Sequence, residues 1–178
     1  MKILILGAGG IGGYFGAQLI RAGADVTFLL RDGRKQLIDG AGLRIETPRG
    51  NFSVQPHTVT AATARPEYDL IVLAPKAYDL DDSLASLAQA DSRGVLLPFL
   101  NGLDHLRVLD ARYGRARVLG GVAHIAATIT PTGAVRQLSD LHRLFVGPRD
   151  AAHEALAREF VAHCEKSGFD STYSGQIE

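Results

Sequence analysis

The chain has 178 residues, enough to bury one hydrophobic core but too few for a second full domain of comfortable size. Lysine plus arginine and aspartate plus glutamate both number 19, so the net charge is zero and we expect neither nucleic acid nor an anionic membrane as a partner. Cys164 is the single cysteine and excludes an internal disulfide, and the first residues lack a basic, apolar leader, so we expect a cytoplasmic protein.

The opening sequence MKILILGAGGIGG combines an apolar strand, a glycine-rich turn and the start of a helix. Residues 2–6 predict a strand buried on both faces, and a helix is predicted over residues 11–22. Gly7, Gly9 and Gly12 fill a G-x-G-x-x-G pattern, which allows a tight turn, a close approach of pyrophosphate to the backbone, and close packing of helix on strand. We therefore predict a dinucleotide site, with a glycine-rich turn that binds nothing as the alternative.

The end of the second strand, predicted over residues 25–30, indicates which dinucleotide is preferred. An NAD site usually places Asp or Glu about 20 residues beyond the glycines to bind the ribose 2′-hydroxyl. Arg31 stands here instead, with Arg34 and Lys35 close behind, and a guanidinium can grip a 2′-phosphate. Asp32 follows this tip and is expected to point away. The pattern favours NADP(H); a solvated charge cluster in a loop is the alternative.

The rest of the chain alternates strands and helices before it becomes rich in strands. Predicted helices cover residues 33–39, 79–90, the segment up to about 112, and 150–167; predicted strands or extended segments cover residues 43–47, 51–55, 69–74, 94–99, 122–129, 134–138 and 142–146. Leu80, Leu84, Leu87 and Ala88 are expected to face inward. This alternation predicts an α/β, doubly wound, Rossmann-type and mostly parallel sheet, which the later strands extend or cover at one edge.

Two polar side chains follow buried strands, where a doubly wound sheet opens its ligand crevice. Lys76 follows residues 69–74 and could reach a cofactor ribose or phosphate, or an anionic substrate. Asn101 follows residues 94–99 and could bind a ribose hydroxyl or a substrate carbonyl. The alternatives are a surface lysine and an ordinary Asn-Gly turn or helix cap. The histidines show no metal-ligand spacing, so we expect no metal site.

Together these motifs resemble the ketopantoate reductases (2-dehydropantoate 2-reductases). The segments that carry the resemblance are GAGGIGGYFG, Arg31, the Lys-Ala-Tyr-Asp at Lys76, the Leu-Asn-Gly-Leu at Asn101, the Gly120-Gly121-Val122 turn and Pro131-Thr132-Gly133. The resemblance implies NADPH-dependent reduction of 2-dehydropantoate in the pantothenate route to coenzyme A. It implies that Asn101 also lies near the substrate carbonyl, and that the cofactor is held by Gly7, Ala8, Gly9, Gly10, Ile11, Gly12, Arg31, Lys76, Asn101 and Ala127, with Ala126 as the alternative to Ala127.

In that family an all-helical domain with the catalytic lysine follows the cofactor domain. The resemblance therefore implies an NADP-binding domain over residues 1–170, a connection starting at 171–178, and a proton donor beyond Glu178. We expect this chain alone to be inactive and the whole protein to act on a small 2-oxo acid, with a homodimer as one arrangement. The alternatives are another NAD(P)-dependent hydroxyacid or opine-type dehydrogenase, and a non-catalytic NADP(H)-binding regulatory module.

Overall fold

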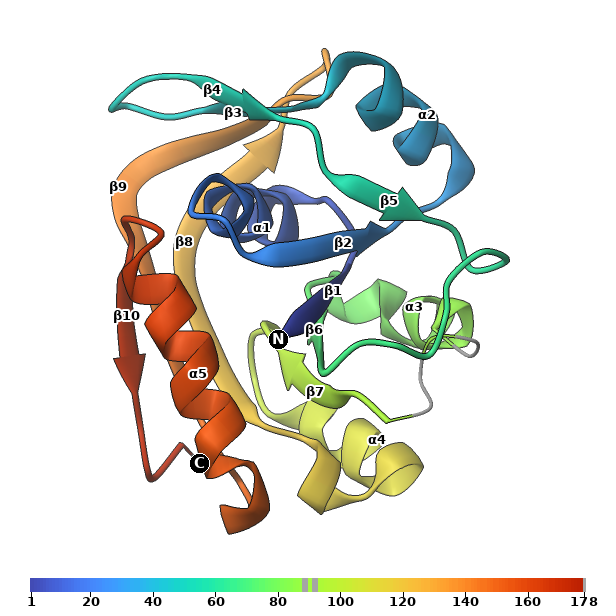
Figure 1. The fold of residues 1–178 in the computed structure, drawn as a ribbon, viewed down its shortest axis with the longest axis vertical. Coiled ribbons are helices and arrows are strands. Elements are labelled where there is room, and N and C mark those ends of the chain that lie inside the picture. The colour runs from blue at the N-terminus through green and yellow to red at the C-terminus, as the bar shows by residue number, and fades with distance from the viewer. Residues whose placement is uncertain (88–89, 91–92, 178) are drawn as a thin grey trace.

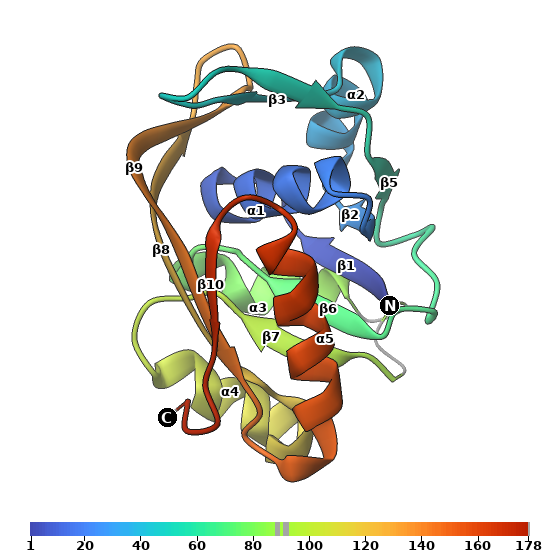
Figure 2. The same ribbon diagram turned by 60° about the vertical axis from the view of Figure 1, so that its left-hand side comes forward.

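The computed structural model describes residues 1–87, 90 and 93–177, which form two sheets with helices around them (Figures 1 and 2). The first sheet is parallel throughout and has the order β5-β2-β1-β6-β7. Its strands are β1 (Lys2–Leu6), β2 (Asp25–Leu29), β5 (His57–Val59), β6 (Leu70–Leu73) and β7 (Val95–Pro98). The chain builds outward from β1 to β2 and β5 and then returns to β6 on the other side. This reversal of strand order confirms the predicted doubly wound sheet.

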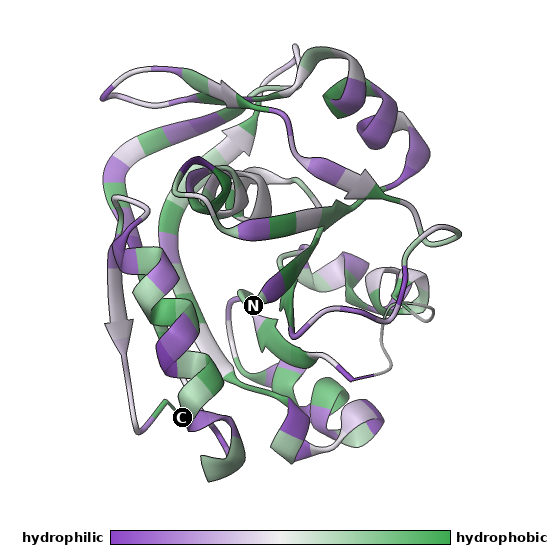
Figure 3. Ribbon diagram, in the orientation of Figure 1, coloured by the Kyte–Doolittle hydropathy of each residue, from purple (hydrophilic) through white to green (hydrophobic). Residues whose placement is uncertain are grey.

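The strands of the first sheet form because their apolar runs are covered on both faces. Ile3 and Ile5 of β1 face one core together with helices α1 (Gly10–Arg21) and α5 (Glu154–Glu165). Leu4 and Leu6 face a second core with α3 (Leu80–Ser86) and α4 (Asp104–Tyr113). Figure 3 shows the inner strands as hydrophobic segments, which is typical of a parallel sheet between helical layers.

The later strands do not extend the first sheet, which was the first of the two arrangements that the sequence allowed. They form a second sheet with the order β10-β9-β3-β4, in which β8 pairs with β9. Its strands are β3 (Leu43–Glu46), β4 (Phe52–Val54), β8 (Gly120–Ile129), β9 (Val135–Gly147) and β10 (Asp170–Tyr173). This sheet passes over α1, so that α1 lies between the two sheets (Figure 2). The physical reason is the helix itself, which is buried along most of its length and needs apolar cover on both sides.

Several predicted boundaries change in the structure. The predicted helix over 79–90 is a short 3₁₀ turn η1 (Ala77–Asp79) followed by α3, which ends at Ser86; Ala88 lies outside the described residues. The strands predicted over 134–138 and 142–146 are one strand, β9, whose register against β8 shifts between Ile125 and Ala127. β10 crosses the domain boundary expected at residue 170, because residues 170–173 pair with β9.

The remaining helical segments follow the sequence closely. Helix α2 (Asp32–Ala41) covers the segment predicted over 33–39, η2 (Arg115–Arg117) follows α4, and η3 (Ala151–His153) precedes α5. The inner face of α5 buries Phe160, Val161 and Cys164. In the part of the chain that the structure describes, no helix combines the length and the apolar character needed to span a membrane.

Candidate functional site

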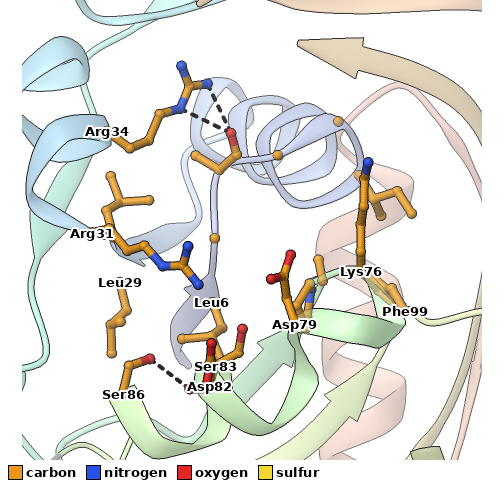
Figure 4. A pocket seen from close by; sticks show the side chains of 18 of the residues that line it. Leu6, Leu29, Arg31, Arg34, Lys76, Asp79, Asp82, Ser83, Ser86 and Phe99 are labelled. Atoms are coloured by element: carbon orange, nitrogen blue, oxygen red, sulfur yellow. Dashed lines mark hydrogen bonds between the residues drawn. The ribbon is translucent and has the colours of Figure 1, made fainter.

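A cavity of about 1230 Å³ opens at the carboxyl ends of the first sheet (Figure 4). Its walls come from residues 6–11 after β1, 29–32 after β2, 74–79 after β6, 99–101 after β7 and 127–129 of β8. Doubly wound sheets bind their ligands at this edge, beside the point where the strand order reverses. The fold therefore brings all the predicted loops to one place.

The glycines of the loop after β1 have different structural roles. Gly7 has φ +92°, a backbone conformation that favours glycine, and its N–H donates to the Leu29 carbonyl at 3.1 Å. A Cβ on Gly12 would overlap the Gly7 carbonyl and lie 3.1 Å from the Ala74 Cβ, so this glycine permits the close packing of α1 on β1. Gly12 does not line the cavity, although it was among the predicted cofactor contacts. Its contacts in the structure are those of helix packing.

Gly9 is a glycine that the fold itself does not require. It is the N-cap of α1 with φ −81°, which any residue adopts, and a Cβ built on it would meet no atom within 4 Å. The space beside it is the cavity. The absence of a side chain at Gly9 therefore leaves room for a ligand against the backbone rather than for another part of the chain.

Strand β8 closes the cavity beside the glycine loop. A Cβ on Gly10 would lie 2.6 Å from the Ala127 carbonyl oxygen, so the two backbones are in close contact. Ala127 lines the cavity, whereas Ala126 is exposed and is not part of its lining. Of the two alanines between which the sequence left a choice, Ala127 is therefore the one at the cavity.

Of the three cations after β2, Arg31 and Arg34 line the cavity, and Arg34 and Lys35 are held by hydrogen bonds to other residues. Arg31 is exposed, lines the cavity, and makes no hydrogen bond or ion pair with any other described residue. Arg34 donates to the carbonyls of Ala8 and Gly133, and Lys35 is held by Asp39 and Thr58. Asp32 also lines the cavity.

Lys76 and Asn101 both line the cavity. Lys76 is exposed, and its Nζ lies 5.6 Å from the centre of the Tyr78 ring, a weak cation–π contact that leaves the ammonium free to meet an anion. Asn101 does not cap the following helix, because the N-cap of α4 is Leu103. The alternative of an ordinary helix cap therefore does not hold for Asn101.

Residues 3–151 match the family model described as ketopantoate reductase PanE/ApbA. The chain belongs to this family. "Uncharacterized oxidoreductase YkpB" of Bacillus subtilis is 36% identical over 148 residues, which cover 83% of this chain and 48% of that protein. The 2-dehydropantoate 2-reductase of Pyrococcus abyssi is 35% identical over 138 residues, which cover 76% of this chain and 44% of that protein. The chain thus spans about half the length of these two relatives.

Solved structures agree with this assignment to the ketopantoate reductase family. The 2-dehydropantoate 2-reductase of Geobacter metallireducens superposes with a TM-score of 0.83 at 28% identity, over 98% of this chain and 58% of that one. A ternary structure of D-mandelate dehydrogenase with NADH and anilino(oxo)acetate shares the fold, with a TM-score of 0.86 at 24% identity, over 99% of this chain and 58% of that one.

One wall of the cavity in this ketopantoate reductase family member was missed by sequence reasoning. Asp79, Asp82, Ser83 and Ser86, from η1 and α3, line it on the side that Arg31 faces (Figure 4). Their spacing of three, four and seven residues puts them on one helical face, and this signal was available in the sequence. Within residues 1–87, 90 and 93–177, no cluster of three His, Cys, Asp or Glu side chains could hold a metal ion.

Proposed function

We propose that this chain is the cofactor-binding part of an NADPH-dependent reductase of 2-oxo acids, with 2-dehydropantoate as the substrate in pantothenate biosynthesis. The observation that carries the choice of cofactor is Arg31, a guanidinium that lines the cavity at the end of β2 and has no ion-pair partner among the described residues. A carboxylate at this position would repel a 2′-phosphate, whereas a guanidinium attracts it and can bind two of its oxygens. Membership of the ketopantoate reductase family supports the choice of reaction.

The residues around the cavity fit a dinucleotide phosphate. The open space at Gly9 admits the pyrophosphate, and the N-terminus of α1 offers backbone N–H groups that the helix cannot use. We assign Arg31 to the 2′-phosphate, Lys76 to a ribose or phosphate, and Asn101 to a ribose hydroxyl or the substrate carbonyl. The backbone of Ala127 closes the cavity beside the glycine loop and would limit the space for the cofactor there.

The chemistry that bound NADPH supplies is donation of a hydride to the carbonyl carbon of the substrate. This chain's residues would bind and orient the cofactor and exclude water from one side. A proton donor is needed as well, because it neutralises the charge that develops on the carbonyl oxygen. A second group is needed to bind the substrate carboxylate and orient the substrate. We propose that these groups lie in the remaining half of the protein, so that this chain alone binds NADPH without useful turnover. Dimerisation through that half is part of the same proposal.

The binding test uses titration of the chain with NADPH and NADH, followed by cofactor fluorescence. We expect NADPH to bind about tenfold to a hundredfold more tightly, which is what one charge-assisted hydrogen-bonding pair contributes. Arg31→Ala should remove the preference. Lys35→Ala is the matched control, because Lys35 is a neighbouring cation that Thr58 holds at 2.8 Å outside the cavity lining. Equal affinities in the unchanged chain would refute the proposed cofactor.

The reaction itself is tested by NADPH oxidation with 2-dehydropantoate, compared with pyruvate, for this chain and for the full-length gene product. We expect turnover of 2-dehydropantoate in the full-length product and none above background in this chain. A faster reaction with pyruvate would contradict the proposed substrate. Near-full activity of this chain alone would contradict the proposal and would mean that a residue described here donates the proton, with Lys76 as the first candidate.

A further inference from the structure

Arg34 joins two backbone segments that lie far apart in the sequence. Its Nη2 and Nε donate to the Ala8 carbonyl at 2.9 and 3.3 Å, the two dashed lines at Arg34 in Figure 4. Its Nη1 donates to the Gly133 carbonyl at 2.7 Å. Ala8 belongs to the glycine loop, and Gly133 belongs to the turn between β8 and β9. One planar guanidinium on α2 therefore fixes the position of the loop relative to the strand pair that closes the cavity.

The bonds to Ala8 also determine where the next N–H group points. In a trans peptide the carbonyl of one residue and the N–H of the next point in opposite directions. Because the Ala8 carbonyl is directed at Arg34, the Gly9 N–H is directed away from Arg34. Gly9 in turn starts the helix, since its own carbonyl accepts the Gly13 N–H at 2.8 Å. The first N–H groups of α1 have no partner within the helix and remain for a ligand.

Arg34 is half-buried without a carboxylate partner among the described residues. A half-buried arginine commonly meets a carboxylate, which neutralises its charge. Among the described residues Arg34 meets only carbonyl oxygens, and no ion pair cancels its charge. The guanidinium therefore keeps its positive charge next to the glycine loop, and this charge favours the binding of an anion to that loop.

We propose that Arg34 is a positioning residue for the pyrophosphate of the cofactor. It holds the glycine loop and the β8–β9 turn in the arrangement that binds phosphate, and it does not bind the 2′-phosphate, which is the role of Arg31. This inference rests on the proposed binding of NADP(H). Loss of Arg34 should therefore weaken NADPH and NADH alike, whereas loss of Arg31 should weaken NADPH alone.

The chain provides a matched control at the same turn. Arg44 of β3 donates from Nη2 to the Thr132 carbonyl at 2.7 Å, next to the carbonyl that Arg34 uses. Its bond reaches the turn without contacting the glycine loop. Arg44→Met thus removes an arginine–carbonyl bond from the turn and spares Ala8, while Arg34→Met removes both attachments.

The experiment measures Kd for NADPH, NADH and adenosine 2′-monophosphate, which lacks the pyrophosphate, well below the unfolding temperature of each variant. We expect Arg34→Met to weaken both dinucleotides by the same factor, about tenfold or more, and to leave adenosine 2′-monophosphate unchanged. Arg34→Lys keeps the charge without the planar fork and should restore part of the affinity. Arg44→Met should bind like the unchanged chain.

The outcomes separate this inference from the proposed function. Unchanged Kd values for both dinucleotides in a folded Arg34→Met would make Arg34 a purely structural residue and overturn the inference. A loss confined to NADPH would make Arg34 a ligand of the 2′-phosphate and overturn it too. If Arg34→Met does not fold, the same comparison is made with Arg34→Lys. Failure of the unchanged chain to bind either dinucleotide would instead refute the proposed function.

Discussion

The second glycine of the loop after β1 allows binding to be separated from folding. A Cβ on Gly9 meets no atom within 4 Å and its φ of −81° suits any residue, so Gly9→Ala adds a methyl group that contacts only the cavity. The expected loss of stability is that of replacing a glycine N-cap by alanine, about 1 kcal/mol or less. For a chain of this size that corresponds to a fall in Tm of about 2–4 °C.

The effect of the same change on the cofactor should be much larger. A methyl group in the space of the pyrophosphate moves it away from the N–H groups of the loop, and hydrogen bonds to charged groups contribute roughly 1.5–3 kcal/mol each. We therefore expect Kd for NADPH to rise by about tenfold to a hundredfold in Gly9→Ala, and further in Gly9→Val. Cofactor fluorescence titration and thermal unfolding, measured on the same samples, give both quantities.

Gly12→Ala is the informative comparison because its methyl group would overlap the Gly7 carbonyl inside the protein. That clash should lower stability by about 1–3 kcal/mol, the usual range for overpacking. The reasoning is refuted if Gly9→Ala binds NADPH normally, or if it destabilises the chain more than Gly12→Ala does. In the first case the loop after β1 would be a structural turn only.

Two further predictions concern buried groups away from the cavity. Burial lowers the pKa of His142 below its usual 6.5, and its Nδ1 lies 2.6 Å from the Tyr14 hydroxyl. Below pH 6.5 the histidine of the unfolded chain therefore takes up a proton that the folded chain does not, which favours unfolding. The free energy of unfolding should fall from pH 7.5 to 5.5, and it should fall less in His142→Asn. An identical pH dependence in that variant would contradict this assignment. Burial also raises the pKa of the Cys164 thiol, so a thiol reagent at pH 8 should label the chain in denaturant but not in the native state, and rapid native labelling would show that α5 opens.

The first sheet was predictable because each of its inner strands is an apolar run that can be recognised locally in the sequence. Apolar runs such as residues 70–73 are buried on both faces, which the composition of the run already indicates. The second sheet was not predictable in the same way. The strands β8 and β9 alternate in exposure and would suit either an extension of the first sheet or a separate one. The choice depends on contacts with α1, which lie outside any local pattern.

The residues of the cavity also fall into a predictable and an unpredictable group. Arg31, Lys76 and Asn101 follow buried strands, so their arrival at one edge of the sheet follows from topology. Arg34 was grouped with Arg31 by proximity, yet its guanidinium binds a carbonyl 99 residues away. The pairing of Tyr14 with His142 spans 128 residues. A single sequence does not show which residues far apart in the chain come into contact. From the sequence alone, a cation close to a candidate site is therefore interpreted as a group that binds the ligand.

The enclosure of α1 between two sheets has a consequence for how a ligand would be received. A helix covered on both sides cannot tilt or slide unless one sheet separates from it, and such separation disrupts the main core. Its N-terminal amides are therefore already ordered before any anion arrives, and little conformational entropy is lost on binding. Recognition of the phosphates is a property of the folded framework, and any adaptation to different ligands falls to the exposed segments around the mouth of the cavity, residues 76–78 and 101–103.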